Sequence, residues 1–399
     1  MQLHNGNLYW PETIKQRTSY PILTEDITCD VLIIGGGISG ALCAEELSHT
    51  ALKTVLVDKR TVGGGSTAAN TGLLQYSNDK MLHELEDDLG EDKAVRFYKL
   101  CLEAIDELQQ LAGSLSLPVD FTRRPSLYYA SSEDDVEKIK KEYKALKKHG
   151  FEVEYLEKKQ IKKYFGFEKP AAIITHGDAE VNPVQLVQAL ISSAEKKGVE
   201  IYENTEVVED WSEGGYLRFQ SQEGMIHAKK VIYSTGYETI PFAQKLGADI
   251  NRTYAIATSP LDKHPEWSYS ALIWETKRPY FYMRRTEDGR IIAGGLDEDE
   301  MEAPLNEEII NQSGQRLLER VREHFNDDKL AVSHSWAASF GESIDGLPFI
   351  GQHPTKENVY YCLGFGGNGT IFSKIGAKIL PDLIRGKENK DAEIFRLDR

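Results

Sequence analysis

The sequence predicts an α/β fold organised around a dinucleotide-binding unit, together with a second domain. Residues 31–34 are an apolar run, residues 35–40 read Gly-Gly-Gly-Ile-Ser-Gly, residues 41–47 follow a helical pattern, and residues 54–57 form a second apolar run before Asp58. A strand, a glycine turn, a helix, a second strand and a terminal acid in this order are typical of a βαβ unit that binds a dinucleotide. The length of 399 residues exceeds one ordinary core and favours two domains.

Each spaced glycine of the turn has its own physical role. Gly35 permits the tight turn, Gly37 allows the backbone to approach a pyrophosphate, and Gly40 allows the helix to pack close to the strand. The N-terminus of that helix offers N–H groups and the positive end of its dipole to phosphates. Asp58 stands where a carboxylate accepts hydrogen bonds from an adenosine ribose.

Composition excludes several classes of partner. The chain is 40% hydrophobic and 28% charged, and its formal net charge of -16 argues against binding to nucleic acid or to an anionic membrane surface. The sequence shows no secretory signal, no apolar run of membrane-spanning length and no metal-binding motif such as HExxH. Four scattered cysteines without a CxxC pair indicate reduced thiols. We therefore expect a soluble, cytoplasmic protein without membrane insertion or a bound metal.

The segment after Asp58 is unusually poor in bulky side chains. Residues 63–72 are glycine, serine, threonine, alanine and asparagine only, and two leucines follow. A flexible linker is one interpretation. We favour a loop whose N–H and hydroxyl groups wrap a phosphate or a flat ring, because a linker would seldom follow a nucleotide-binding acid and then become apolar.

The remaining elements follow from hydrophobic periodicity. Three- and four-residue spacing predicts helices over residues 80–112, 134–149 and 306–325, and another helix that begins near Pro183. Alternating or continuous apolar residues predict strands at 118–130, 199–202 and 230–233, the last ending in the small residues 234–236.

A second glycine loop, residues 364–370, precedes a final helix near the C-terminus. An NAD-dependent dehydrogenase does not require such a loop. A flavin dinucleotide is long enough to need two helix N-termini, one at the pyrophosphate and one at the pyrimidine edge of the flavin, where negative charge grows on reduction. This arrangement favours FAD over NAD.

Several motifs in order resemble those of the D-amino-acid oxidase superfamily of FAD-dependent oxidoreductases, which includes glycine oxidase, sarcosine oxidase and gamma-glutamylputrescine oxidase. The resemblance covers nearly the whole chain. The segments that carry it are residues 28–31 before the glycine turn, 63–72, 178–183, Val207, 234–236, 282–284, 288–290, 345–348 and 364–370.

The resemblance implies a discontinuous FAD domain of the glutathione-reductase type, which is Rossmann-like, with an inserted antiparallel-sheet substrate domain. The FAD domain would comprise residues 26–80, 170–240 and 337–390. The substrate domain would comprise residues 81–169 and 241–336, and residues 1–25 would be an irregular lead-in.

The resemblance also implies a set of cofactor-binding residues. The pyrophosphate, ribose and adenine end would involve Gly35, Gly37, Ile38, Ser39, Gly40, Asp58, Lys59, Val207, Thr235 and Gly236. The flavin ring would be lined by Ser66, Thr67, Asn70, Gly72, Leu73, Gly366, Asn368, Gly369 and Thr370. Residues 339–344 contain no cysteine, whereas members with covalent flavin can carry one there, so the expected FAD is non-covalent.

For the substrate, the resemblance implies that Arg284 pairs with a carboxylate and that Tyr282 supplies an aromatic wall. The adjacent Arg285 leaves open which arginine faces the site, because strand alternation does not separate the pair. Asn368 stands where the family often has histidine, and Ala69 where it often has arginine.

The implied reaction is oxidation of the C–N bond of an amine or amino acid by hydride transfer to flavin N5, followed by imine hydrolysis, with oxygen as acceptor. One alternative is a flavin dehydrogenase that acts on an amine or a 2-hydroxy acid and passes electrons to a non-oxygen acceptor. Another is a non-catalytic flavoprotein subunit, which would show no reduction of the flavin by a substrate.

Overall fold

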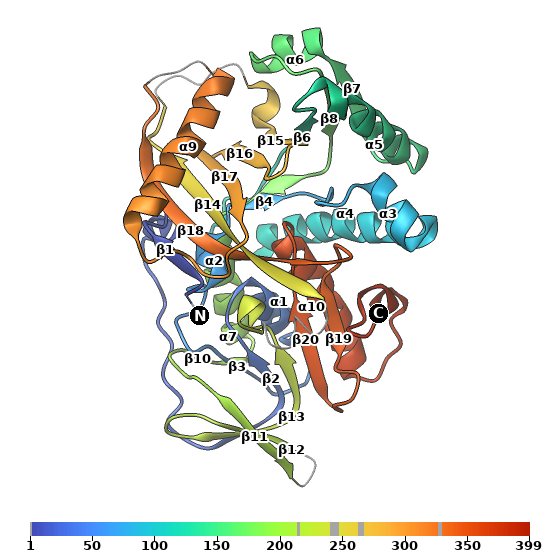
Figure 1. The fold of residues 1–399 in the computed structure, drawn as a ribbon. Helices are drawn as coiled ribbons and strands as arrows, with labels where there is room; N and C mark the ends of the chain where they lie inside the picture. Colours follow the sequence, from blue (N-terminus) through green and yellow to red (C-terminus); the bar gives the residue numbers. More distant parts are fainter. Residues whose placement is uncertain (1, 214–215, 240–246, 262–266, 326–328) are drawn as a thin grey trace.

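A computed structural model describes residues 2–213, 216–239, 247–261, 267–325 and 329–399. Two large sheets lie one above the other in Figure 1, and helices cover their outer faces. The chain crosses between the two sheets several times, because strands of each come from widely separated parts of the sequence. The predicted α/β fold class is confirmed.

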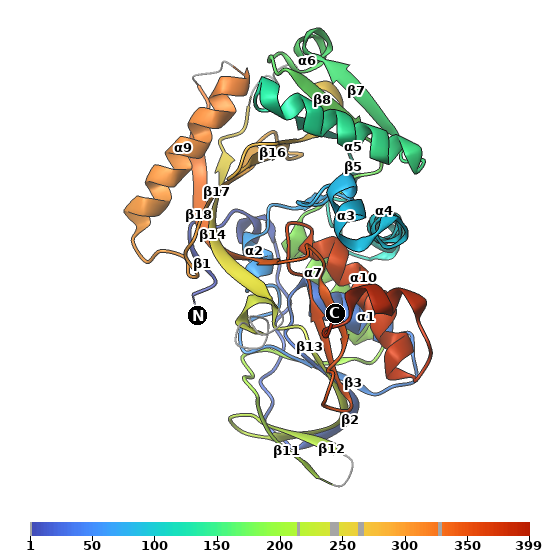
Figure 2. The same ribbon diagram turned by 45° about the vertical axis from the view of Figure 1, so that its right-hand side comes forward.

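The larger sheet is mostly antiparallel and contains nine strands among the described residues. In spatial order these are β1 (His4–Gly6), β18 (Val332–Ser343), β14 (Ala248–Thr258), β17 (Ile291–Glu298), β16 (Phe281–Arg285), β15 (Leu272–Glu275), β6 (Ser126–Tyr129), β8 (Ala171–Thr175) and β7 (Val153–Glu157). Helix α9 (Glu307–Phe325) packs on one face of this sheet against β14, β17 and β18 (Figure 2).

The smaller sheet has a parallel centre, as expected for strands that are apolar along their whole length. Its spatial order is β10 (Glu200–Tyr202), β3 (Thr54–Val57), β2 (Ile27–Ile34), β13 (Met225–Tyr233), β12 (Tyr216–Gln220) and β11 (Val208–Glu213), and β20 (Val359–Leu363) pairs with both β13 and β19 (Phe349–Gln352). Strand β2 lies between β3 and β13 in parallel register, which completes the predicted βαβ unit.

Helices cover the smaller sheet and the space beside it. Helix α1 (Ile38–Leu47) is buried and packs against both α7 (Pro183–Lys196) and α10 (Gly369–Ile384). A three-stranded sheet of β4 (Leu73–Leu74), β9 (Ala179–Glu180) and β5 (Thr122–Arg123) lies among these elements. The remaining α-helices in the described part of the chain are α2 (Ser66–Ala69), α3 (Leu82–Leu89), α4 (Glu91–Ser114), α5 (Val136–Lys148) and α6 (Lys158–Phe165).

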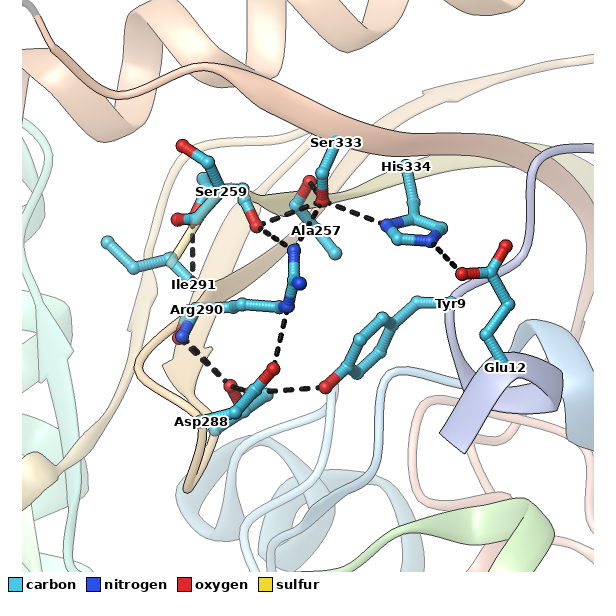
Figure 3. Close-up of polar contacts among 11 residues, drawn as sticks. Tyr9, Glu12, Ala257, Ser259, Asp288, Arg290, Ile291, Ser333 and His334 are labelled. Carbon is cyan, nitrogen blue, oxygen red and sulfur yellow. Dashed lines mark hydrogen bonds and ion pairs between the residues drawn. The ribbon is translucent and has the colours of Figure 1, made fainter. Parts of the chain in front are cut away.

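The N-terminal segment is fixed to the larger sheet by polar contacts (Figure 3). The Tyr9 hydroxyl donates to Asp288 at 3.1 Å, and the Arg290 guanidinium donates to the same carboxylate at 2.7 Å. Glu12 contacts His334 of β18 at 3.0 Å. Burial, together with the Asp288 charge, raises the pKa of Tyr9 to about 12, so its hydroxyl remains a donor at neutral pH.

Some elements differ from the expectations. Residues 4–6 form an edge strand rather than an irregular lead-in, because pairing with β18 supplies an order that this short polar stretch lacks alone. Residues 66–69 form one helical turn within the expected loop. Strand β8 and the whole of β18 pair within the larger sheet, whereas the division of the chain into an FAD domain and a substrate domain stays a prediction. Such a pairing depends on tertiary contacts that no local pattern encodes.

Gly40 of α1 packs against the glycine turn that follows β2, because an added Cβ there would lie 1.8 Å from the carbonyl oxygen of Gly35. We expect Gly40→Ala to lower the free energy of unfolding by about 3 kcal/mol or more. The added methyl group can be accommodated only if the backbone of α1 and the backbone of the glycine turn move apart. Chemical denaturation measures this change.

Gly113, inside α4, offers a matched control, since no atom lies within 4 Å of the Cβ position there. Gly113→Ala should leave stability unchanged or raise it slightly. Equal effects of the two substitutions would contradict the packing role of Gly40.

Candidate functional site

A cavity of about 560 Å³ lies between the two large sheets. Its walls come from the glycine turn after β2, the segments after β3 and β13, the loop that contains α2, the loop before α10, and the strands β14 to β18. Its volume falls within the range of ligand-binding pockets, roughly 300 to 1,000 Å³. Elements from both sheets therefore meet at one site.

Two helices begin at this cavity. Helix α1 starts after Gly37, helix α10 starts after Asn368, and neither has an acidic residue in its first turn. At the start of α1, the backbone N–H of Ile38 donates to the Thr67 hydroxyl at 3.0 Å. The Ser39 and Ser373 hydroxyls, one from each helix, are 2.7 Å apart on the cavity wall. Helix N-termini attract anions through their N–H groups and their dipoles.

Asp58 lies on the cavity wall at the end of β3. Its carboxylate accepts backbone hydrogen bonds from Gly36 at 2.6 Å and from Arg60 at 2.7 Å. Burial raises the pKa of Asp58 above its ordinary value, and the two backbone hydrogen bonds oppose this shift. Asp58 thus ties the glycine turn to the end of the second strand.

Beside Asp58, two basic side chains share one carboxylate. The Arg60 guanidinium binds Glu238 through two hydrogen bonds of 2.9 and 2.8 Å, and Lys59 lies 2.9 Å from the same group. Both basic residues line the cavity.

The loop at residues 66–72 is held from behind by side-chain donors. The carbonyl of Ala69 accepts from the indole of Trp336 at 2.9 Å, and the carbonyl of Asn70 accepts from the indole of Trp10. The carbonyl of Thr71 accepts from Arg284 at 2.8 Å. These donors turn three consecutive carbonyls away from the cavity, so that the other face of the loop lines it.

Arg284 does not lie on the cavity wall, contrary to the expectation that it meets a substrate carboxylate. Its side chain is buried, with 3% of the residue exposed, and it also donates to the carbonyl of Val181 at 2.9 Å. Its guanidinium lies 3.4 Å from the buried Glu180 carboxylate and 5.0 Å from the centre of the Trp10 ring. Because its donors are committed to these groups, Arg284 fixes the loop and is not available to a ligand.

The loop before α10 is joined to residues 77–79. The side-chain amide of Asn368 donates to the carbonyl of Ser77 at 2.8 Å and to Asn78 at 3.0 Å. The backbone N–H of Gly367 donates to Asp79 at 3.1 Å. Asn368 therefore positions a neighbouring segment of the wall, in addition to lining the cavity.

Aromatic side chains from the larger sheet cover the far end of the cavity. Tyr282 of β16 pairs with Trp274 of β15 on one side and with Gly294 of β17 on the other, so their side-chain positions share one face of the sheet. An added Cβ at Gly294 would lie 2.3 Å from the Tyr282 hydroxyl, so the Tyr282 ring lies across this glycine. Tyr280, Tyr282 and Trp274 all line the cavity.

Most of the predicted site residues come together at this cavity. Those that line it are Gly35, Gly37, Ile38, Ser39, Asp58, Lys59, Ser66, Thr67, Asn70, Leu73, Val207, Thr235, Gly236, Tyr282, Gly366, Asn368, Gly369 and Thr370. Gly40, Gly72 and Arg284 are not part of its wall. Gly40 packs against the strand, and Gly72 lies against the Arg284 side chain.

Sequence reasoning missed several residues of the site. Trp336 and Trp274 carry no local signal, because their roles depend on which strands pair in the larger sheet. Asp79 and Asp297 are acidic residues in unremarkable sequence surroundings that fold onto the cavity wall. Trp10 lies within residues 1–25, which the sequence predicts only as an irregular lead-in.

Comparison with known proteins agrees with this geometry. The sequence profile of a family described as FAD dependent oxidoreductase (DAO) matches residues 30–383. The chain belongs to this family. It is therefore an FAD-dependent oxidoreductase.

Three similar proteins illustrate the relationship. The chain is 26% identical to YhfW of Bacillus subtilis (strain 168), which carries the provisional name of a Rieske 2Fe-2S iron-sulfur protein, over 98% of this chain and 75% of that one. It is 22% identical to gamma-glutamylputrescine oxidoreductase of Escherichia coli (strain K12), over 97% and 90%. The crystal structure of glycine oxidase from Geobacillus kaustophilus superposes with a TM-score of 0.81 at 21% identity, over 93% and 99%.

The residues present fit FAD. The cavity joins the N-termini of two helices, which suits a ligand with anionic character at two separate places. Between them, the face of the 66–72 loop that lines the cavity consists of small side chains, which leaves room for a flat ring.

No helix among the described residues is both long and apolar enough to span a membrane.

The buried position of Arg284 makes a prediction about this oxidoreductase. Arg284→Ala should lower the free energy of unfolding by about 1–3 kcal/mol and reduce FAD occupancy, because the Thr71 and Val181 carbonyls lose their donor and Glu180 keeps only its ion pair with Arg124. Denaturation and the ratio of flavin to protein absorbance measure these effects.

Arg285, the half-buried neighbour, is the matched control, and Arg285→Ala should change both quantities much less. Full FAD occupancy and stability in Arg284→Ala, with a higher KM only for substrates that carry a carboxylate, would show that Arg284 contacts substrate instead.

Proposed function

We propose that this oxidoreductase oxidises the C–N bond of an amine or amino acid, with oxygen as the final electron acceptor. The observation that carries the proposal is the single cavity that connects the βαβ turn, the 66–72 loop, the start of α10 and an aromatic end. The names of the relatives, glycine oxidase and gamma-glutamylputrescine oxidoreductase, support this substrate class.

The cofactor would extend along the cavity from Asp58 to the aromatic end. The α1 N-terminus would hold the pyrophosphate, Asp58 the ribose, and Val207 the adenine side. The loop that contains Ser66 and Asn70 would line the flavin ring. Helix α10, which begins after Asn368, would face the pyrimidine edge with Gly369 and Thr370.

The reaction balances as a two-electron oxidation. Bound FAD supplies the acceptor for a hydride from the carbon next to nitrogen. The substrate loses that C–H bond and one N–H proton, a C=N bond forms, and water then hydrolyses the imine. Oxygen takes the two electrons and is reduced to hydrogen peroxide. Tyr282 and Trp274 would orient the C–H bond and exclude water from it.

The cysteines and the support of the 66–72 loop also agree with this proposal. The four cysteines are buried and free, and none lines the cavity among the described residues, which supports non-covalent FAD and a reducing, cytoplasmic location. The three consecutive carbonyls held by Trp336, Trp10 and Arg284 keep the ring-facing loop in one conformation.

A second candidate is a dehydrogenase that delivers electrons to another acceptor. The relation to YhfW, named for an iron-sulfur centre, is the observation that favours it. Oxygen and an artificial dye acceptor distinguish the two candidates, because only an oxidase re-oxidises its reduced flavin rapidly in air. A dehydrogenase would turn over with the dye and not with oxygen.

We expect the purified protein to be yellow and to lose its visible flavin absorbance when an amine or amino acid is added without oxygen. The measurement is anaerobic spectroscopy with a panel of amines, amino acids and 2-hydroxy acids. Bleaching only by a hydroxy acid would refute C–N oxidation. A protein that cannot be loaded with FAD would refute the cofactor placement.

Asp58→Ala should weaken FAD binding by about tenfold, because the variant loses the carboxylate that faces the ribose and that orders Gly36 and Arg60. Quenching of flavin fluorescence on binding measures the dissociation constant. The control is Asp87→Ala, at an exposed position of α3. If the unaltered protein, Asp58→Ala and Asp87→Ala all bind FAD with the same affinity, the proposed contact between Asp58 and the ribose is excluded.

A further inference from the structure

The aromatic end of the cavity is acidic. Asp79 and Asp297 line it there, and the basic residues that line the cavity among the described positions are Lys59 and Arg60. Those two follow β3 at the opposite end and are paired with Glu238. A ligand group at the aromatic end therefore meets negative charge without a compensating cation on the wall.

Neighbouring carboxylates add to the negative charge at the aromatic end of the cavity. Burial, with a smaller contribution from the Asp79 charge, raises the pKa of Asp297 to about 6, and a hydrogen bond from Thr253 opposes this shift. Burial also raises the pKa of Glu342 to about 7, with Asp79 and Asp297 as the next causes. Arg278 opposes both shifts, but its side chain is exposed and lies over the Tyr280 ring at 4.6 Å, off the cavity wall.

A second feature of the same end also indicates a ligand. Trp274 lines the cavity with only 5% of the residue exposed, and its indole N–H has no hydrogen-bond partner among the described residues. The nitrogen itself is buried, so other atoms of the Trp274 side chain face the cavity. Tyr280 and Tyr282 stand beside it on the wall, and aromatic faces attract a cation at close range.

We propose that this end of the cavity selects an aliphatic amine that carries a second, positively charged nitrogen and no carboxylate. The proposal rests on the proposed function and specifies its substrate class. The reacting amine, neutral, would lie near Trp274, and the second nitrogen, as an ammonium group, would face Asp79 and Asp297.

The same arrangement disfavours a substrate with a carboxylate. Arg284, the arginine expected to bind one, is committed to the Thr71 and Val181 carbonyls and to Glu180. A carboxylate at the aromatic end would face Asp79 and Asp297 instead, and like charges in a partly buried site repel strongly.

Three substrates with four carbon atoms each test the proposal. These are 1,4-diaminobutane, butylamine and 4-aminobutanoate, which share one reacting amine and end in an ammonium, a methyl and a carboxylate group. With the FAD-loaded full chain, anaerobic flavin reduction gives kcat/KM for each. We expect the diamine to exceed butylamine by about tenfold and 4-aminobutanoate by more.

The outcomes separate the two proposals. Fastest reduction by 4-aminobutanoate, equal rates for all three, or reduction only by amino acids such as glycine would overturn the diamine selectivity and leave C–N oxidation standing. No reduction by any amine or amino acid would overturn both.

Charge-neutral variants provide the structural test. Asp297→Asn and Asp79→Asn should each lower the ratio of diamine to butylamine kcat/KM by about tenfold, because each removes one negative charge that faces the ammonium group. The control is Asp249→Asn, an exposed position of β14 outside the cavity wall, which should preserve the ratio.

Flavin absorbance of each variant confirms that the protein is folded and loaded. Anaerobic equilibrium titration of the chemically reduced protein, whose flavin can no longer accept a hydride, with 1,4-diaminobutane gives an independent binding constant. An unchanged ratio and an unchanged binding constant in both cavity variants would refute the proposal.

Discussion

The shape of the cavity depends on the conformation of the loop at residues 66–72, and three side-chain hydrogen-bond donors fix that conformation. Trp336 comes from the larger sheet, Trp10 from the N-terminal segment and Arg284 from β16, and each donates to one of three consecutive carbonyls. A loop of small residues has little side-chain packing of its own, so its conformation must be imposed from outside. The buried guanidinium, paired with Glu180, is the part of this support that is most sensitive to loss.

This support also joins the two sheets. The loop follows β3 of the smaller sheet, whereas its donors belong mainly to the larger sheet and to the segment that pairs with it. The cavity lies where the two sheets meet, with the N-termini of two helices on one side and aromatic and acidic side chains on the other. In the proposed function, the helices beside the smaller sheet hold the cofactor and the larger sheet selects the substrate.

The sequence determined the parts of the molecule that are local. Residues 31–58 formed the expected βαβ unit, and the second glycine loop opened a helix, as predicted. Nearly all predicted cofactor residues line one cavity, although their contacts with FAD stay predictions. Glycine spacing, apolar runs and a terminal acid specify such a unit because each of its requirements is met within a few residues of the chain.

Which residues lie at the aromatic end of the cavity, where the substrate is proposed to bind, was decided only by the tertiary structure. The family resemblance placed Arg284 against a substrate carboxylate, but strand pairing buried its guanidinium behind the loop. The same pairing gathered Trp274, Tyr282 and Asp297 from three neighbouring strands, and Asp79 from a distant segment, on one wall. No local pattern contains this information, because the face that a strand residue occupies depends on its register with partners far away in the sequence.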